Sequence, residues 1–595
     1  MTAAVHAEIA ADGQRIVLIA AGAIEDIAFT AKQLQQTTPL FKTSNPKGAL
    51  LCPLTWAAVV QLAAVYGPAW RPGPNLQTWI TEQISARTAD LTTPLRAPIP
   101  DGYTPRPYQV EGANMIAATG HTLITDEPGT GKTITTILGL IELWGRSMNK
   151  ENPSPMPILV ICPASVVDPW VQAFRDWIPF WRTAAWRGSP KRRRGLIGEA
   201  DVYVTSYDTA RMDAKDTNPA HSPLIELDPR ALVADECHLI KNHHAARSAA
   251  VRRIARNAKA FVALSGTPIT HHPADLWPTL TCLAPGAWPS RERWVNRYCL
   301  SVPADYGETI LGLHPGNEPE FRTTLLGQQR RVAKADVLDQ LPPKVYSVRA
   351  VELPPAYRKA YDAMENDMLA QMPDGGELSV MSVLAQMTRL SQLASAAAEV
   401  TTTTEINDSG EQVEHVSVTL TNPSWKVDAM LEICAERPDQ QVVAFAPSAQ
   451  LMRLAGESAA KAGLRVGYVI GGQSMKDRTE TVEKFQGGHL DLICATTGAG
   501  GVGITLTAAS TVVFLQRPWS LVESIQAEDR AHRIGSERHE SIEIVDIVAL
   551  DTLDTRVRAV LRERAGQLSA LVQDPRIVAE LLGGASVHPL RKKAS

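Results

Sequence analysis

Short apolar runs alternate with amphipathic stretches in two separate parts of the chain, and this alternation limits the folds that the chain can adopt. The first part, from about residue 120, contains HTLIT, ILVICP, DVYVTS, ALVADE and AFVALSG. The second, from about residue 440, contains QVVAFAP, RVGYVIGG, LDLICATT, TVVFLQ and IEIVDIVA. Strands that alternate with helices form parallel sheets covered on both faces. The pattern therefore predicts an α/β chain with two parallel-sheet lobes.

The composition is that of an ordinary globular chain without a strong net charge. Of the 595 residues, 44% are hydrophobic and 21% are charged, and such a length is a prior for about four domains of about 150 residues each. The formal net charge of -4 argues against a wholly basic nucleic-acid binder. Any nucleic-acid surface must therefore be a local patch.

The seven cysteines are odd in number, scattered and never spaced as CxxC, which indicates neither a disulfide framework nor a zinc module. We expect buried free thiols, a reducing compartment and no zinc. The N-terminus, MTAAVHAEIA, has no basic region before an apolar stretch, and no apolar run approaches the ~20 residues that a bilayer crossing needs. We expect a cytoplasmic protein of a bacterial or phage-infected cell, with no membrane partner.

The N-terminal part of the chain predicts a small α+β accessory domain at residues 1–100, which could recognise DNA or substrate. It contains one clear strand, RIVLIA, and helical segments near residues 55–66 and 76–86. A stretch rich in proline and threonine at residues 91–107 predicts a linker, because proline fixes the chain and removes backbone donors.

The two lobes follow this linker. The first is predicted at residues 101–340 with a helical insertion, and the second at residues 341–570 with a helical protrusion and a hairpin. The hairpin is indicated by TTTTEI and EQVEHVSVTL on either side of the turn residues 407–410. Residues 571–595 are a predicted C-terminal tail, disordered over its last eleven residues.

Residues 126–133, DEPGTGKT, lie between a predicted strand and a predicted helix and indicate a phosphate loop. Glycines allow backbone N–H groups to approach phosphates at the positive end of the following helix. Lys132 would meet the β- and γ-phosphates of ATP, and the Thr133 hydroxyl would bind Mg²⁺. Asp126 replaces the first glycine of the GxxxxGK[ST] pattern, so the match is to the shorter GxGKT form. The predicted ATP-binding residues of this loop are Gly129, Thr130, Gly131, Lys132 and Thr133.

Residues 235–238, DECH, follow the apolar run LVA and place two carboxylates at the C-terminal end of a strand, where ligands of open α/β sheets bind. Asp235 would hold Mg²⁺ through water, and Glu236 would orient or deprotonate the attacking water. The alternative is a strand that ends in solvated acids.

Residues 526–535, QAEDRAHRIG, place Arg530 and Arg533 three positions apart on a predicted helix, so that both face the same way. A planar guanidinium can neutralise the charge on a transferring phosphoryl group. The alternative is a solvated basic helix. Because the three motifs solve different parts of phosphoryl transfer, together they predict an ATP-hydrolysing motor with Lys132, Asp235, Glu236, Arg530 and Arg533 as catalytic residues.

The motifs also resemble those of the Swi/Snf-type ATPases of helicase superfamily two, over about residues 104–560. RPYQVEG is similar to the adenine-contacting glutamine motif, with Gln109 in that position. VICPASVVDPW, VTSY, LSGTPI, TTGAGGVGITLT and QAEDRAHRIG follow in the family order, and RRVAKADVLDQLPPK at residues 330–344 resembles the segment that separates this family from other helicase-like motors. The resemblance implies two RecA-like lobes that close on one ATP.

The resemblance also implies roles for residues outside the three motifs. Ser265 and Thr267 would couple hydrolysis to lobe movement. Gly500, Gly501 and Gly503 would line the closing cleft. Gly503 would also contact the nucleotide. The chain departs from the family pattern at Ser536, at Gly498 and at RPWS, where WNP is usual.

One basic run, KRRR at residues 191–194, could hold DNA phosphates. A solvated surface loop or a nuclear address are the alternatives. Tryptophans at positions 170, 177 and 181 share one helical face, which favours core packing over base stacking. The histidine pairs at 243–244 and 271–272 lack metal-ligand partners and indicate solvated loops.

These inferences predict an ATP- and Mg²⁺-dependent motor that tracks along double-stranded DNA, including forked or branched DNA, and remodels it or displaces bound proteins. The preference for duplex DNA comes from the resemblance alone. One alternative is a strand-separating DNA or RNA helicase, and another is a scaffold that binds DNA without hydrolysing ATP. The accessory domain resembles the module that precedes the motor in annealing-helicase relatives, with a plain packing domain as the alternative. Protein partners are not predicted.

Overall fold

The computed structural model divides into two compact units, Met1–Val337 and Leu338–Ser595, and each is described by itself. The structure describes residues 5–20, 41–42, 50–87, 90–96, 98–148, 154–266, 273–288, 290–303, 308–325, 328–338, 340–370, 380–406, 412–500, 504–572 and 587–589.

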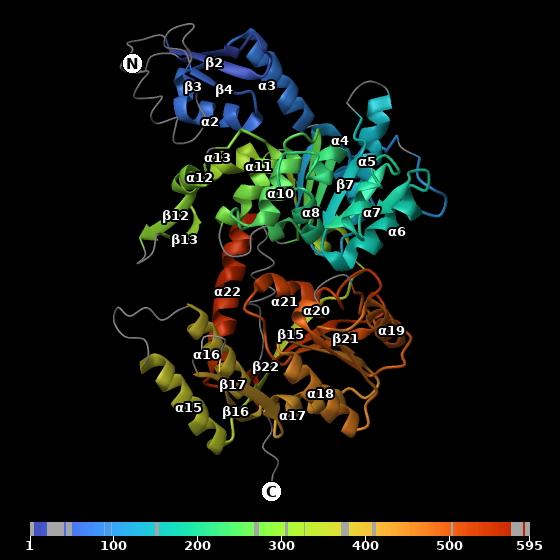
Figure 1. The fold of residues 1–595 in the computed structure, drawn as a ribbon, viewed down its shortest axis with the longest axis vertical. Helices are drawn as coiled ribbons and strands as arrows, with labels where there is room; N and C mark the ends of the chain where they lie inside the picture. Colours follow the sequence, from blue (N-terminus) through green and yellow to red (C-terminus); the bar gives the residue numbers. More distant parts are fainter. Residues whose placement is uncertain are drawn as a thin grey trace. The chain divides into compact units, whose positions relative to one another are not determined.

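The first unit begins with a small five-stranded sheet in the described residues, in the order β3-β4-β2-β1-β5 (blue in Figure 1). Thr55 caps the helix that packs on it, because the Thr55 hydroxyl accepts a hydrogen bond from Ala58 N at 3.2 Å. The Trp56 indole donates to the carbonyl of Thr323 at 3.0 Å, which attaches this region to the rest of the unit. The elements are β1 (Val5–Ile9), β2 (Arg15–Ala20), β3 (Phe41–Lys42), β4 (Leu50–Pro53), α2 (Trp56–Tyr66), β5 (Trp70–Pro72) and α3 (Pro74–Arg87).

The predicted linker is hydrogen-bonded to the two helices that follow it, Pro107–Thr119 and Lys132–Met148. The Asn114 side chain donates to the carbonyls of Leu91 at 2.9 Å and Thr93 at 2.7 Å, and the backbone N–H of Arg96 donates to the carboxylate of Glu142 at 2.9 Å.

The described residues of the first unit also form a seven-stranded parallel sheet, in the order β14-β6-β11-β10-β7-β9-β8. All five strands predicted for the first lobe are present, and β8 and β14 were not predicted. The strands are β6 (His121–Ile124), β7 (Ile158–Cys162), β8 (Thr183–Ala185), β9 (Val202–Ser206), β10 (Ala231–Asp235), β11 (Ala260–Leu264) and β14 (Gln329–Arg330).

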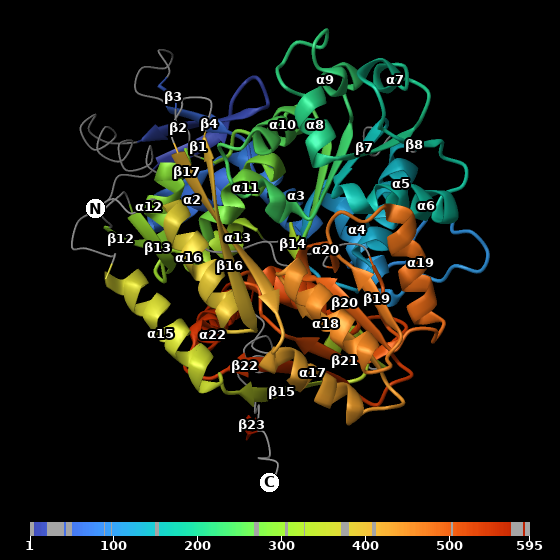
Figure 2. The same cartoon turned by 60° about the horizontal axis from the view of Figure 1, so that its bottom comes forward.

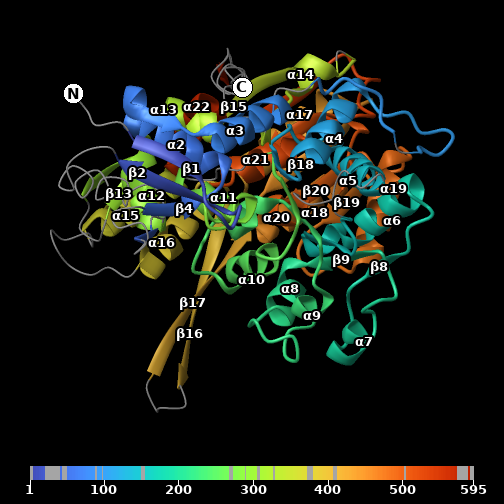
Figure 3. The same ribbon diagram turned by 90° about the horizontal axis from the view of Figure 1, so that it is seen from above.

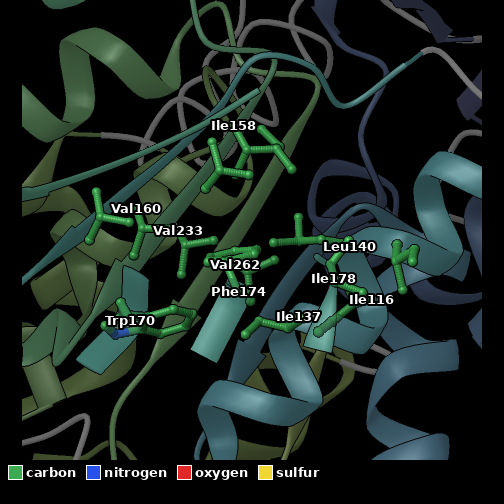
Figure 4. Packing of buried hydrophobic residues seen from close by; sticks show 14 of the residues in the cluster. Ile116, Ile137, Leu140, Ile158, Val160, Trp170, Phe174, Ile178, Val233 and Val262 are labelled. Atoms are coloured by element: carbon green, nitrogen blue, oxygen red, sulfur yellow. The ribbon is translucent and has the colours of Figure 1, made fainter. Parts of the chain in front are cut away.

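One face of this sheet carries a core in which strand residues such as Val160 and Val233 pack with Ile137, Leu140 and Trp170 from the covering helices (Figure 4). These helices are α4 (Pro107–Thr119), α5 (Lys132–Met148) and α6 (Val167–Trp177), and the remaining helices of the unit include α7 (Pro190–Arg194), α8 (Tyr207–Asp213), α9 (Pro223–Leu227), α10 (Ala246–Ala255), α11 (Trp277–Leu283), α12 (Arg291–Tyr298), α13 (Glu318–Thr324) and α14 (Lys334–Val337). A short hairpin, β12 (Cys299–Pro303) and β13 (Glu308–Leu313), belongs to the predicted insertion.

The second unit contains another seven-stranded parallel sheet among its described residues, in the order β19-β20-β18-β21-β22-β15-β23 (Figure 2). All five predicted strands of the second lobe are present. The strands are β15 (Lys344–Val351), β18 (Gln441–Ala446), β19 (Val466–Val469), β20 (Leu492–Thr496), β21 (Ala509–Phe514), β22 (Ile542–Ala549) and β23 (Val587–Pro589). The predicted fold class, α/β with two parallel sheets and a small N-terminal α+β region, is therefore confirmed.

The two strands of the hairpin predicted for the second unit are confirmed, and its predicted turn, residues 407–410, lies outside the described residues. Its strands pair antiparallel from Ala397 with Thr421 to Ile406 with Gln412, and the hairpin projects from this unit (Figure 3). The elements are α15 (Pro355–Ala370), α16 (Val380–Leu393), β16 (Ala397–Ile406), β17 (Gln412–Thr421), α17 (Trp425–Ala435), α18 (Ala449–Lys461), α19 (Met475–Gln486), α20 (Thr497–Gly500), α21 (Leu521–Glu528) and α22 (Leu553–Val572).

Part of the predicted disordered tail is a strand, because Val587–Pro589 pair with β15. The rest of residues 585–595 lies outside the described residues. None of the described helices is long and apolar enough to cross a membrane.

Candidate functional site

The phosphate loop, residues 126–131, connects β6 to α5 as the sequence predicted. Gly129 and Gly131 have φ angles of 88° and 83°, which non-glycine residues rarely adopt. A Cβ at position 131 would also lie 2.6 Å from Gln109 Nε2, so a larger residue there would displace the Gln109 side chain from the loop. The loop leads into the N-terminus of α5, where the helix dipole favours negative charge.

Lys132 and Gln109 both contact the loop. Lys132 Nζ donates to the carbonyls of Asp126 at 2.8 Å and Glu127 at 3.2 Å. Gln109 Nε2 donates to the carbonyl of buried Thr130 at 3.4 Å, and its Oε1 accepts from the backbone N–H of Arg106 at 2.9 Å. The structure therefore places Gln109 against the phosphate loop, where the adenine contact inferred from the resemblance remains a proposal.

Tyr108 adds a contact that the sequence did not indicate. Its hydroxyl donates to the same Thr130 carbonyl at 2.8 Å. Thr133 is the second residue of α5 and is partly exposed. Its hydroxyl is therefore accessible to a metal ion beside the loop.

Asp235 is the last residue of β10, and two side chains and one backbone group hold it. The Trp170 indole N–H donates to Asp235 Oδ2 at 2.8 Å, and the backbone N–H of Glu236 donates to Oδ1 at 3.0 Å. The Tyr207 hydroxyl donates to the Asp235 backbone carbonyl at 2.7 Å. These contacts fix the plane of the carboxylate.

Burial and the neighbouring charge of Glu236 raise the pKa of Asp235 to about 6, and the Trp170 hydrogen bond and the charge of Lys132 oppose this shift. The first two motifs follow the C-terminal ends of β6 and β10, which belong to one parallel sheet, so they lie at the same edge of that sheet. Carboxylate and hydroxyl oxygens suit Mg²⁺, and a nearby lysine suits the phosphates of a bound nucleotide.

Glu236 has a left-handed backbone, with φ 53° and ψ 54°. For a non-glycine residue such a conformation costs about 1–2 kcal/mol, and it is concentrated at functional sites. His238 Nδ1 lies 3.2 Å from Glu236 Oε2 and 3.2 Å from Ser265 Oγ. These contacts form a chain from Glu236 to the LSGTPI motif, whose Thr267 lies outside the described residues.

Sequence reasoning did not identify Trp170 and Tyr207 as contacts of Asp235. Core packing was predicted for the three tryptophans and is confirmed: Trp170 and Trp181 are buried and Trp177 packs against the core. The indole N–H of Trp170 nevertheless has a polar partner. A buried tryptophan usually needs such a partner, and this was the available signal.

The helix predicted for Arg530 and Arg533 is wrong. Helix α21 ends at Glu528, and both arginines lie in the irregular segment after it. The Arg530 carbonyl accepts from the backbone N–H of Leu506 at 2.9 Å, and the Arg533 carbonyl accepts from that of Ser536 at 2.9 Å. We call residues 529–535 the arginine loop. Local turn hydrogen bonds, such as that from His532 N to the Glu528 carbonyl at 3.1 Å, and the long-range bond from Leu506 hold this backbone.

The two guanidinium groups differ in their surroundings. Arg530 donates to the carbonyl of Ile504 at 3.4 Å. Burial lowers the pKa of Arg533, and the charge of Asp529 opposes this shift. Gly500 ends α20, whereas Gly501 and Gly503 lie outside the described residues.

The departures from the family pattern have distinct surroundings. Ser536 is fully buried beside the arginine loop, and Gly498 is exposed. In RPWS, Arg517 is buried and pairs with Glu528 and Asp546 at 2.6 Å each. Its guanidinium also lies 3.8 Å from the centroid of the Phe514 ring. This departure therefore contributes to the core of the second unit.

The prediction that all four cations of residues 191–194 could hold DNA phosphates is wrong, because one of them is buried. These residues form the short helix α7, in which Arg193 is buried and pairs with Asp213 at 2.5 Å. Arg194 pairs with Glu226 at 2.9 Å. Lys191 and Arg192 are the exposed pair that remains for a phosphate.

The histidine and cysteine predictions have separate outcomes. His244 is exposed, but the ring of His243 packs against Trp277 at 5.8 Å, so position 243 is not simply solvated. His271 and His272 lie outside the described residues. All seven cysteines are buried and free, as predicted. Within the described part of the chain no cluster of three metal-ligating residues is found.

Two family models match consecutive parts of this chain. The SNF2-related domain matches residues 108–398, and the helicase conserved C-terminal domain matches residues 425–535. The TATA-binding protein-associated factor MOT1 of Saccharomyces cerevisiae is 26% identical over 538 residues, which cover 80% of this chain and 28% of MOT1. The DNA annealing helicase and endonuclease ZRANB3 of Mus musculus is 28% identical over 495 residues, which cover 82% of this chain and 42% of ZRANB3.

The chain thus spans less than half the length of these curated relatives. Among solved structures, the Sulfolobus solfataricus SWI2/SNF2 ATPase core in complex with dsDNA is 22% identical, with a TM-score of 0.37. The match covers 84% of this chain and 100% of that chain.

Proposed function

Because the chain belongs to the Swi/Snf-type helicase-like ATPases, we propose that it is an ATP- and Mg²⁺-dependent translocase on double-stranded DNA. In this proposal the RecA-like lobes are residues 101–340 and 341–570, and residues 1–100 are an accessory domain. The observation that carries the proposal is that Lys132, at the start of α5 after β6, and Asp235, at the end of β10, follow the C-terminal ends of strands of one parallel sheet.

The residues of the first unit fit a nucleotide bound with a metal ion. Gly129, Thr130 and Gly131 form a backbone cradle, and Lys132 neutralises the phosphates. Thr133 and Asp235 hold Mg²⁺, which would neutralise charge on the transferring phosphoryl group. Gln109 contacts the adenine, beside the loop that it already touches.

Hydrolysis requires an oriented water and neutralisation of the charge that develops on the phosphoryl group. Glu236 orients or deprotonates the water, from a backbone conformation fixed by the turn after β10. Arg530 and Arg533 act on the same triphosphate from the second unit, and Gly503 contacts the nucleotide there. Such arginine fingers contribute about 10³ to 10⁵ in rate.

The proposed substrate is duplex DNA, contacted through phosphates and without base reading. It is supported by membership of the family and by the DNA-directed name of ZRANB3. Forked or branched DNA is included in the proposal, and the relatives' protein partners are not transferred. The exposed cations Lys191 and Arg192 are the remaining part of the proposed phosphate patch.

The test is ATPase activity of the full chain with duplex, forked, branched and single-stranded DNA and with RNA. We expect the strongest stimulation by DNA that contains duplex, and no turnover by Lys132→Ala. Preferential stimulation by RNA or single-stranded DNA would favour a strand-separating helicase. DNA binding without turnover by the wild-type chain would favour the scaffold.

A further inference from the structure

The segment that joins the two units, residues 328–344, is fastened at its first end to the phosphate loop. Its strand β14 pairs in parallel with β6, and the backbone contacts continue beyond the strand. Thr125 N donates to the carbonyl of Arg330 at 2.7 Å, and Glu127 N donates to the carbonyl of Val332 at 3.0 Å. The segment therefore runs beside the residues that lead into the loop.

Side chains strengthen this first attachment. Arg330 Nε lies 3.5 Å from Asp126 Oδ1, and the side chains of both residues are less than one-tenth exposed. The Glu127 carboxylate accepts from the backbone N–H of Lys334 at 2.8 Å and lies 3.7 Å from the Arg331 guanidinium. Removing one partner of a buried ion pair leaves a charge without compensation. Asp126, which replaces the usual first glycine of the loop, thus has a structural partner in the joining segment.

The C-terminal end of the same segment contacts the arginine loop and Glu528, the residue that precedes this loop. The Pro342 carbonyl lies 2.9 Å from His532 Nε2. Lys344 Nζ lies 3.2 Å from Glu528 Oε2 and 3.2 Å from Asp529 Oδ1, and all three side chains are less than one-tenth exposed.

The charges around Glu528 favour its ionised form, which can pair with Lys344 at this second attachment. Burial alone would raise the pKa of Glu528, but Lys344 and Arg517 together hold it below its usual value. The Tyr346 hydroxyl donates to the same carboxylate at 2.8 Å. Glu528 and Asp529 directly precede Arg530, so their contacts restrict the backbone from which that arginine projects.

We propose that residues 328–344 are a tether, which Arg330 holds on the phosphate loop and Lys344 holds on the arginine loop. Arg330 and Lys344 are then positioning residues for the two halves of hydrolysis. This inference rests on the proposed function, because it assumes that both loops serve one ATP. Eight residue steps separate Lys334 from Pro342, and a chain of that length spans at most about 28 Å. The tether therefore limits the separation of the two loops through their anchors.

The two anchors have different expected kinetic effects. Arg330→Gln loosens the phosphate loop, so we expect the KM for ATP and the Kd of a non-hydrolysable ATP analogue to rise about 10-fold, with a smaller change in kcat. Lys344→Gln loosens the arginine loop, so kcat falls about 10-fold while the Kd of the analogue is unchanged. Lys344→Arg keeps a cation between Glu528 and Asp529 and restores kcat.

Two ion pairs provide matched controls. In the first unit, Arg182→Gln removes an exposed ion pair with Asp201. In the second unit, Arg349→Gln removes the ion pair between Arg349, which lies on β15 like Lys344, and Glu436. Neither should change KM or kcat by more than about 2-fold.

If Arg330→Gln does not fold, Asp126→Asn combined with Arg330→Gln removes both buried charges and should show the same rise in Kd. An unchanged Kd in the folded variant, or equal effects of the two anchor variants and the two control variants, overturns the assignment of the anchors.

The length of the tether is tested by inserting four or eight Gly/Ser residues after Gln340, between the anchors. Analogue affinity should remain within 2-fold, whereas kcat with duplex DNA should fall at least ~10-fold as the constraint on the loops is relaxed. The same insertions after Gly463, in an exposed turn of the second unit, are the control. Normal kcat with both insertions after Gln340 overturns the tether and leaves the proposed function intact. No turnover by the wild-type chain overturns the proposed function, and the tether with it.

Discussion

Asp235 shows how a few residues convert a strand end into a metal-binding candidate. Trp170 and the backbone of Glu236 each donate to one oxygen of its carboxylate. A metal-binding carboxylate that is held in this way needs little reordering when the ion binds. Trp170 therefore has two roles, since its ring is core and its N–H orients the acid.

We expect Trp170→Phe to raise the Mg²⁺ concentration for half-maximal ATPase about 10-fold, because the carboxylate loses its indole donor. Trp186→Phe is the matched control. The Trp186 indole donates to Asp213 Oδ2 at the same distance, 2.8 Å, but outside the candidate site. Both variants should lose about 1–3 kcal/mol of unfolding free energy. Equal Mg²⁺ requirements in the two variants would contradict a role for Trp170 in holding Asp235.

Glu528 permits a prediction about pH, because Lys344 and Arg517 hold its pKa below the ordinary value of 4.5. A carboxyl whose pKa is lower in the folded state stabilises the fold above its unfolded pKa, and this contribution is lost as the pH falls through the folded pKa. Glu528→Gln should therefore lower the unfolding free energy by about 3 kcal/mol at pH 7. The difference from wild type should shrink below about pH 4.5 in urea titrations at several pH values. A difference that is constant down to pH 3.5 would show that the charge of Glu528 contributes nothing.

At the scale of elements, the strands were predictable and the ends of several elements were not. A parallel strand buried on both faces is a continuous apolar run, as in ILVIC of β7, and a single sequence displays that pattern directly. Strand β14 has two residues, Gln329 and Arg330, and owes its existence to pairing with β6. Such pairing is set by the tertiary structure, so local composition could not predict it.

The candidate site divides in the same way. Lys132, Asp235 and Glu236 follow apolar strands, and their positions beside the sheet could be predicted. The end of α21 at Glu528 could not, because it depends on the burial of Glu528 among distant charges and on the hydrogen bond from Leu506 to Arg530. Sequence spacing alone favoured a continuous helix.

Helix α7 gives a prediction that separates structural from surface cations. Arg193→Ala leaves buried Asp213 without its cation and should cost about 3–5 kcal/mol of unfolding free energy. The double variant Lys191→Ala, Arg192→Ala should change stability by no more than about 0.5 kcal/mol. Urea denaturation measures both. A small loss for Arg193→Ala would restore the four-cation patch that the sequence indicated.

At the scale of the whole molecule, the proposed function divides the residues for ATP hydrolysis between the two units. The first unit supplies the phosphate loop and the acids, and the second supplies the arginine loop. The division of labour would explain why the chain needs two parallel sheets and a joining segment attached to both loops. If the proposed function holds, Arg530, which is distant in sequence from Lys132, should affect catalysis without affecting nucleotide binding.

The most direct test is single-turnover ATP hydrolysis by Arg530→Ala with duplex DNA, together with the Kd of a non-hydrolysable ATP analogue. The account predicts a loss of at least ~10²-fold in rate with little change in Kd, because the guanidinium acts in the transition state. Arg538→Ala, an exposed arginine in the same region, should keep the wild-type rate. A normal rate for Arg530→Ala would contradict the claim that the two units serve one ATP.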